Sequence, residues 1–152
     1  MKVYIVGNPL VEEDSLPMRM LSLLHKEFPH VVFEDVDPNE NFFPEEGSVI
    51  IDTIKGISDV TWFTDIHSFI TTKSVSAHDF DLGFHLQLIT KLHKLRTIKI
   101  LGIPIGMSRD KALVTVSKAL RVSLFPDRKD KRQKRSNRDN THRHHAKPPL
   151  ED

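Results

Sequence analysis

The fold class of this chain is decided by the stretch KVYIVGNPLVEEDSLPMRMLSLL, residues 2–24. Residues 3–6 are apolar and mostly β-branched, which predicts a short, fully buried strand that the Gly-Asn-Pro run of residues 7–9 stops. Apolar residues then recur at helical spacing, which predicts a helix. Pro17 is tolerated only in the first turn of a helix, where backbone N–H groups lack partners within the helix. We therefore expect the helix to start within a residue or two of Asp14.

The alternation of strands and helices continues along the chain. Short apolar runs predict further strands, the third of them near an edge of the sheet, at residues 31–36, 48–51, 60–64 and 97–101. A helix opens at Ser76 in a capping box, and a last helix opens at Ser108. Strands interleaved with helices favour an α/β fold: a single domain with a mostly parallel central sheet and helices on both faces.

The composition excludes several classes of protein. The chain has 152 residues and no cysteine, which removes disulfides, zinc ribbons and thiol catalysis. No apolar run approaches the roughly 18 residues that a membrane span needs. The apolar N-terminal run is also shorter than the apolar region of a signal peptide, about 7 to 15 residues. We therefore expect a cytoplasmic protein with no membrane partner.

Residues 127–152 differ from the rest of the chain in charge and in apolar content. They carry nine basic and five acidic residues, a net charge of +4, which leaves −3 for residues 1–126. Because residues 131–138 offer no apolar side chain to bury, we expect a disordered, basic, histidine-containing tail after a domain of residues 1–126. The tail would permit weak, salt-sensitive contact with nucleic acid. A solvated tail is the simpler interpretation, so no nucleic-acid partner is expected.

Three potential metal ligands stand where predicted strands end or helices begin. Asp14 precedes the first helix, Asp52 closes the strand of residues 48–51, and His78 lies at the start of the helix that Ser76 opens. The carboxyl ends of neighbouring parallel strands face one crevice, so distant segments could deliver two carboxylates and an imidazole to one point. Such a set without a thiolate suits a divalent ion of intermediate softness, such as nickel, zinc or manganese. The spacing does not choose among these ions.

Each of these residues also has an ordinary structural interpretation. Asp14 suits the N-terminal cap of a helix, Asp52 could form a turn, and His78 could be a surface histidine. A protonated imidazole at a helix N-terminus opposes the helix dipole, which favours a neutral ring that is able to bind a metal. His67, expected in the loop before His78, could support the site without binding the ion.

Four pieces of sequence, in one order, carry a resemblance to a known family. They are Gly-Asn-Pro-Leu followed by acids up to Asp14, an apolar strand ending in Asp52, the run Ser-x-His-Asp-Phe-Asp-Leu-Gly-Phe that contains His78, and the Ile-Leu-Gly-Ile-Pro of residues 100–104. Over residues 2 to about 122 the chain resembles the nickel–iron hydrogenase maturation proteases. Two positions depart from that family: Ile5 replaces the first glycine of Gly-x-Gly-Asn, and Pro17 stands where a glycine is common.

The resemblance implies an α/β fold with a twisted central sheet and a specific peptidase activity. It implies an endopeptidase that removes a C-terminal extension from a hydrogenase large-subunit precursor once nickel has been inserted. It further implies that Asp14, Asp52 and His78 coordinate that nickel, which the precursor would carry, and that Asp37 lies in the substrate cleft.

The chemistry of cleavage stays open at this point. A metal with three protein ligands could polarise the scissile carbonyl or activate water. If nickel arrives with the substrate as a recognition element, Asp14 or Asp52 could instead act as the general base. The two departures from the family keep an alternative in view, a non-catalytic, nickel-dependent binding or checkpoint module of the same fold.

Overall fold

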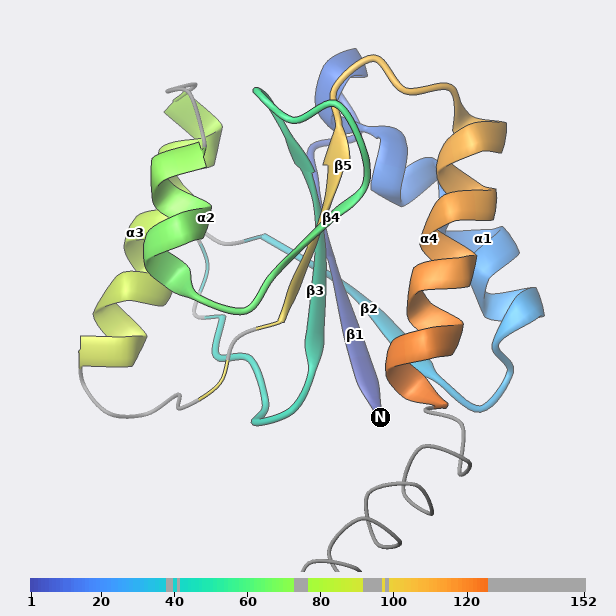
Figure 1. Cartoon of the computed structure of the whole chain (residues 1–152), viewed down its shortest axis with the longest axis horizontal. Coiled ribbons are helices and arrows are strands. Elements are labelled where there is room, and N and C mark those ends of the chain that lie inside the picture. The colour runs from blue at the N-terminus through green and yellow to red at the C-terminus, as the bar shows by residue number, and fades with distance from the viewer. Residues whose placement is uncertain (38–39, 41, 73–76, 92–96, 98, 126–152) are drawn as a thin grey trace, which may run out of the picture. The chain divides into compact units, whose positions relative to one another are not determined.

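The computed structural model describes residues 1–37, 40, 42–72, 77–91, 97 and 99–125 (Figure 1). The chain divides into two compact units, residues 1–119 and residues 120–152. The first unit contains the whole sheet, and the described part of the second is the end of the last helix.

The first unit is built on a five-stranded sheet. Its strands are β1 (Lys2–Val6), β2 (Val32–Val36), β3 (Val49–Ile54), β4 (Thr61–Phe63) and β5 (Ile100–Pro104). The order across the sheet is β2-β1-β3-β5-β4, and only β4, at one edge, pairs antiparallel with its neighbour. The predicted mostly parallel sheet, with a strand near residues 60–64 at an edge, is confirmed.

Helices cover both faces of this sheet, as predicted. They are the short 3-10 helix η1 (Glu12–Asp14) and the α-helices α1 (Leu16–Glu27), α2 (Ile66–Thr72), α3 (Ala77–Lys91) and α4 (Arg109–Leu124). Within the first unit, α2 and α3 lie on one face, while α1 and the beginning of α4 lie on the other (Figure 1). Pro17 falls in the first turn of α1, where the sequence required it.

Strand β3 forms the centre of the sheet, and all six of its residues are buried. A parallel strand covered by helices on both faces needs apolar side chains in both directions, so it reads as a continuous apolar run. Ile50 and Ile54 point to the face of α2 and α3, where they belong to one apolar cluster with Phe69. Thr53 points to the opposite face, because successive side chains of a strand alternate.

Two strands extend beyond their predicted ends. Asp52 was expected to close its strand, but β3 continues to Ile54. The strand expected at residues 97–101 instead runs from Ile100 to Pro104. Gly102 does not end that strand, because its missing side chain makes room: a Cβ there would lie 2.4 Å from Ile54 Cδ1. The glycine serves packing against β3 and not a turn.

Residues 66–72, expected to be a loop containing His67, form helix α2. The Asp65 carboxylate accepts a hydrogen bond from the Ser68 backbone N–H at 2.8 Å, which satisfies a free donor at the start of the helix. Phe69 is fully buried and fixes the helix to the sheet. The exposed side chain of His67 lies on this helix and not in a loop.

The predicted tail of residues 127–152 lies outside the described residues, so its disorder and the boundary at residue 126 stay predictions. In the part of the chain that the structure describes, none of the helices has the length and apolar character needed to cross a membrane.

Candidate functional site

Asp14 lies in a tight loop that follows β1. The Asn8 backbone N–H donates a hydrogen bond to Asp14 Oδ2 at 2.8 Å, and the Asp14 N–H donates to the Val11 carbonyl at 3.0 Å. The backbone of Gly7 comes so close to Asp14 that a Cβ at residue 7 would lie 2.5 Å from the Asp14 carbonyl oxygen. The Gly-Asn-Pro run therefore shapes a loop around Asp14, in addition to ending the strand.

The interpretation of Asp14 as the N-terminal cap of α1 is wrong. Asp14 is the last residue of η1, and Ser15 occupies the cap position of α1 without a side-chain capping bond. The Ser15 hydroxyl instead donates to the Glu12 carbonyl at 3.0 Å. The Asp14 carboxylate is thus directed to partners outside the helix that it precedes.

Thr53 joins Asp14 to the central strand. Its Oγ1 donates to Asp14 Oδ1 at 3.0 Å and lies 3.4 Å from the Asp14 carbonyl oxygen. Thr53 is only 1% exposed. Because Thr53 directly follows Asp52 in β3, this bond holds Asp14 against the residue next to Asp52.

Asp52 is buried in the middle of β3, with 3% of its surface exposed. It shares a face of the sheet with Ile50 and Ile54, and it stands opposite Gly102 in the register of β3 and β5. That is the face covered by α2 and α3 (Figure 1). A carboxylate at such depth is costly unless hydrogen bonds, an opposite charge or a metal ion compensate for the lost water. The turn interpretation of Asp52 is excluded by its place inside the strand.

His78 is the second residue of α3, which begins at the end of the sheet where β1 and β3 finish (Figure 1). Its side chain, like Ser76 of the expected capping box, lies outside the described residues. Among the described residues, no group of three His, Asp or Glu side chains lies close enough to hold a metal ion, and that set does not include the His78 side chain. Coordination of one ion by Asp14, Asp52 and His78 stays a prediction.

The donor set nevertheless suits a divalent cation. An ionised carboxylate has about four acceptor positions, and the Asn8 and Thr53 bonds use one position on each oxygen of Asp14. Within the part of the chain that the structure describes, these two bonds leave one lone pair on each oxygen for an ion. Two carboxylates and one imidazole would hold nickel or another ion of intermediate softness.

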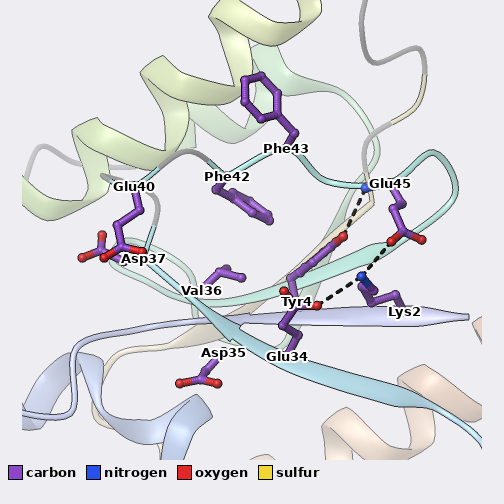
Figure 2. Close-up of a pocket in the computed structure, with 10 residues that line it drawn as sticks. All are labelled: Lys2, Tyr4, Glu34, Asp35, Val36, Asp37, Glu40, Phe42, Phe43 and Glu45. Carbon is purple, nitrogen blue, oxygen red and sulfur yellow. Dashed lines mark hydrogen bonds and ion pairs between the residues drawn. The ribbon is translucent and has the colours of Figure 1, made fainter.

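A cleft of about 750 Å³ lies beside β1 and β2, and Asp37 lines it (Figure 2). Five carboxylates and one ammonium group give this cleft an acidic lining, together with three aromatic rings. The full lining is Lys2, Tyr4, Glu34, Asp35, Val36, Asp37, Glu40, Phe42, Phe43 and Glu45. The position of Asp37 suits the predicted substrate cleft, and entry of substrate there stays a prediction.

One wall of the cleft is held together by Lys2. Its ammonium contacts Glu45 at 2.7 Å and Glu34 at 3.1 Å, and these hydrogen bonds raise the pKa of Lys2. The same ammonium lies 5.5 Å from the centre of the Tyr4 ring, whose hydroxyl accepts the Glu45 N–H at 3.4 Å. Sequence reasoning missed this group, because its members come from three segments of the chain and no local motif links them.

Comparison with solved structures identifies the fold. The solution structure of an endopeptidase from Escherichia coli superposes with a TM-score of 0.54 at 15% identity, covering 81% of this chain and 94% of that one. The crystal structure of the Hydrogenase 3 maturation protease gives 0.52 at 18% identity, covering 78% and 87%. An uncharacterized protein from Wolinella succinogenes also gives 0.52 at 18% identity, covering 83% and 98%.

The sequence itself matches no protein-family model and no curated protein. The structural likeness shows an α/β fold shared with an endopeptidase and, more particularly, with a hydrogenase maturation protease. This is the fold that the four sequence motifs implied.

Proposed function

We propose that this protein is an endopeptidase that removes a C-terminal extension from a nickel-loaded nickel–iron hydrogenase large-subunit precursor. The fold shared with an endopeptidase and a hydrogenase maturation protease supports the class of reaction. The observation that carries the proposal is the hydrogen bond from Thr53 to Asp14, because it ties one motif acid to the residue beside the other. A shared fold alone would not require a side chain of β3 next to Asp52 to bind the carboxylate of Asp14.

In this proposal Asp14, Asp52 and His78 recognise the nickel that the precursor brings. A nickel ion bound there would polarise a nearby carbonyl and mark the precursor as loaded. The burial of Asp52 suits it to hold the cation, because a carboxylate attracts a cation more strongly where less water screens the charges. His78 adds the nitrogen donor from the start of α3.

Asp14 is the better candidate for the general base. A base must lie within hydrogen-bonding reach of the proton that it accepts, and the half-buried side chain of Asp14 is more open to water than that of Asp52. The bonds from Asn8 and Thr53 fix the direction of its carboxylate. The acidic cleft beside Asp37 would receive another part of the precursor, which is the expected protein partner.

The direct test is incubation of the full chain with nickel-loaded and nickel-free precursor, followed by mass spectrometry. Loss of a C-terminal peptide from the loaded precursor alone is the expected result. Nickel-dependent binding without a change of mass would instead identify a checkpoint module. If the chain neither binds nor cleaves the precursor, both functions are rejected.

The same assay tests His78. His78→Gln keeps approximate size and polarity but supplies a much poorer ligand, so we expect a folded protein that no longer processes the precursor. His30→Gln is the matched control, because His30 is an exposed residue of the turn before β2. Processing by His78→Gln at the wild-type rate would remove His78 from the site.

A further inference from the structure

We propose that Thr53 is a positioning residue whose hydroxyl sets the direction of the Asp14 carboxylate and thereby the affinity of the site for a divalent cation. The inference rests on the proposed function, because it takes Asp14 and Asp52 to be ligands. It adds a residue to which neither the sequence motifs nor the resemblance assigned a role.

The two oxygens of Asp14 are held by different parts of the fold. Oδ2 accepts the Asn8 N–H from the loop after β1, at 2.8 Å, and Oδ1 accepts the Thr53 hydroxyl from β3, at 3.0 Å. Rotation of an aspartate carboxylate about its last bond is only weakly restricted by its own rotamer preferences. Two bonds from two elements restrict it, and removal of one leaves the carboxylate plane free to turn about the other.

Thr53 is well suited to set a direction. It lies in the central strand, in register with Ile103 of β5, and is 1% exposed. Its β-branched side chain has few χ1 choices, so the hydroxyl keeps one orientation. The hydroxyl has a single proton, and the shorter of its two contacts with Asp14 is the one to the carboxylate.

The consequence concerns how Asp14 and Asp52 are placed relative to each other. Asp52 and Thr53 are consecutive in β3 and point to opposite faces of the sheet. The Thr53 hydroxyl ties Asp14, which arrives from the loop after β1, to the strand that carries Asp52. Loss of groups that orient metal ligands typically costs about 10- to 100-fold in metal affinity or activity, and we expect a loss in this range when the hydroxyl is removed.

A merely structural hydroxyl would behave differently. Its removal would lower the urea midpoint of unfolding, because a buried hydrogen bond is lost, and would leave the affinity for metal unchanged. The chain offers a matched case: the buried Ser117 hydroxyl donates to Glu27 Oε2 at 2.6 Å, in contact with α1 and away from Asp14. Ser117→Ala removes the same kind of bond without touching the candidate site.

The experiment compares Thr53→Val, Thr53→Ser and Ser117→Ala in the full chain. Valine keeps the branched shape and loses the hydroxyl, whereas serine keeps the hydroxyl. Binding of Ni²⁺ alone is measured by titration calorimetry, and Co²⁺ absorption spectra report the coordination geometry. Residues 127–152 contain three histidines, and histidine is a common metal ligand, so the part of the Ni²⁺ binding that disappears in His78→Gln defines the site.

We expect the affinity of this site for Ni²⁺ to fall about 10- to 100-fold in Thr53→Val. The Co²⁺ absorption spectrum should change as well. Thr53→Ser should keep most of the affinity, and Ser117→Ala should lose stability without losing affinity. Unfolding in urea verifies that each variant is folded. Wild-type affinity in folded Thr53→Val, or an equal loss in Thr53→Ser, would overturn the role of the hydroxyl while leaving the peptidase proposal intact. Both the role of Thr53 and the peptidase proposal would be overturned if the wild-type chain shows no Ni²⁺ binding that depends on His78 and does not cleave the precursor.

Discussion

Replacing Gly7 with alanine should damage both the stability of the fold and the loop that holds Asp14. A Cβ at this position would lie 2.5 Å from the Asp14 carbonyl oxygen, whereas close carbon–oxygen contacts in proteins begin at about 3.3 Å. The obstacle is backbone, so no side chain is able to turn away, and the loop must move by about 0.8 Å. Overpacking of this kind costs about 1–3 kcal/mol.

The backbone of Gly7 adds a second cost. Its φ of +157° lies in a region that L-residues rarely adopt, and holding alanine there costs about 1–3 kcal/mol more. We therefore expect the free energy of unfolding to fall by about 2–6 kcal/mol in Gly7→Ala. Gly47→Ala is the control, because Gly47 has φ +78° but a Cβ added there would meet no atom within 4 Å. Only its backbone cost applies, about 1–2 kcal/mol.

The measurement is urea unfolding followed by far-ultraviolet circular dichroism, with the two variants compared by their midpoints and slopes. Gly7→Ala should lose clearly more stability than Gly47→Ala, and the steric contact is the difference between them. If Gly7→Ala is as stable as Gly47→Ala, the close approach of residue 7 to Asp14 is not a constraint of the fold. The loop would then be able to accept a Cβ at residue 7 and still hold Asp14.

Three further predictions concern the fold around the site. Phe69→Ala should lower the free energy of unfolding by about 3–5 kcal/mol, since Phe69 is fully buried, and a loss below about 1 kcal/mol in urea unfolding would contradict its role. The Ser68 backbone N–H lowers the pKa of Asp65, so the stability from this carboxylate is present above its unfolded pKa and is lost as the pH falls through the folded one. The difference in melting temperature between wild type and Asp65→Ala should therefore shrink in acid. A difference that stays constant with pH would show that the charge of Asp65 does not stabilise the fold. Removal of residues 127–152 should leave the melting temperature within a few degrees, because that segment has no apolar pattern to pack; a large drop would show that it docks.

The local part of the fold could be predicted from the sequence because it depends on consecutive residues. A buried strand, a Gly-Asn-Pro stop and a proline in the first turn define β1 and α1, and both appear at the expected places. Helix α2 was missed because its residues Ile66–Thr72 include β-branched side chains that favour strands, and its stability comes from the burial of Phe69. That burial depends on a tertiary contact that no local pattern contains.

Gly102 shows the same limit in a strand. Gly-Ile-Pro after an apolar run is a reasonable stop signal, yet these residues continue β5. Their pairing with β3 decides the outcome, because Ile54 and Phe63 occupy the space that a side chain at residue 102 would need. From the sequence alone, a glycine that ends a strand and a glycine that admits a neighbour's side chain look alike.

The candidate site was predictable only in outline, for a related reason. Motifs singled out Asp14, Asp52 and His78 as residue types, but the link between the acids runs through Thr53, whose role depends on the length of β3 beyond Asp52. Had the strand ended at Asp52, as expected, Thr53 would have been a turn residue without a fixed direction.

The extension of β3 also determines where a shared ion would have to lie. Asp52 points to the face of α2 and α3, while Thr53, on the opposite face, holds Asp14. We therefore expect an ion bound by both carboxylates to lie towards the carboxyl end of the sheet, where the loop after β1 brings Asp14, and not over the middle of either face. Helix α3 starts at that same end (Figure 1). Ligands gather at this edge in open α/β sheets because the loops that follow neighbouring parallel strands meet there. In the proposed site, one central strand would thus supply a candidate ligand, Asp52, to one face and a support for the other candidate ligand, Asp14, on the opposite face.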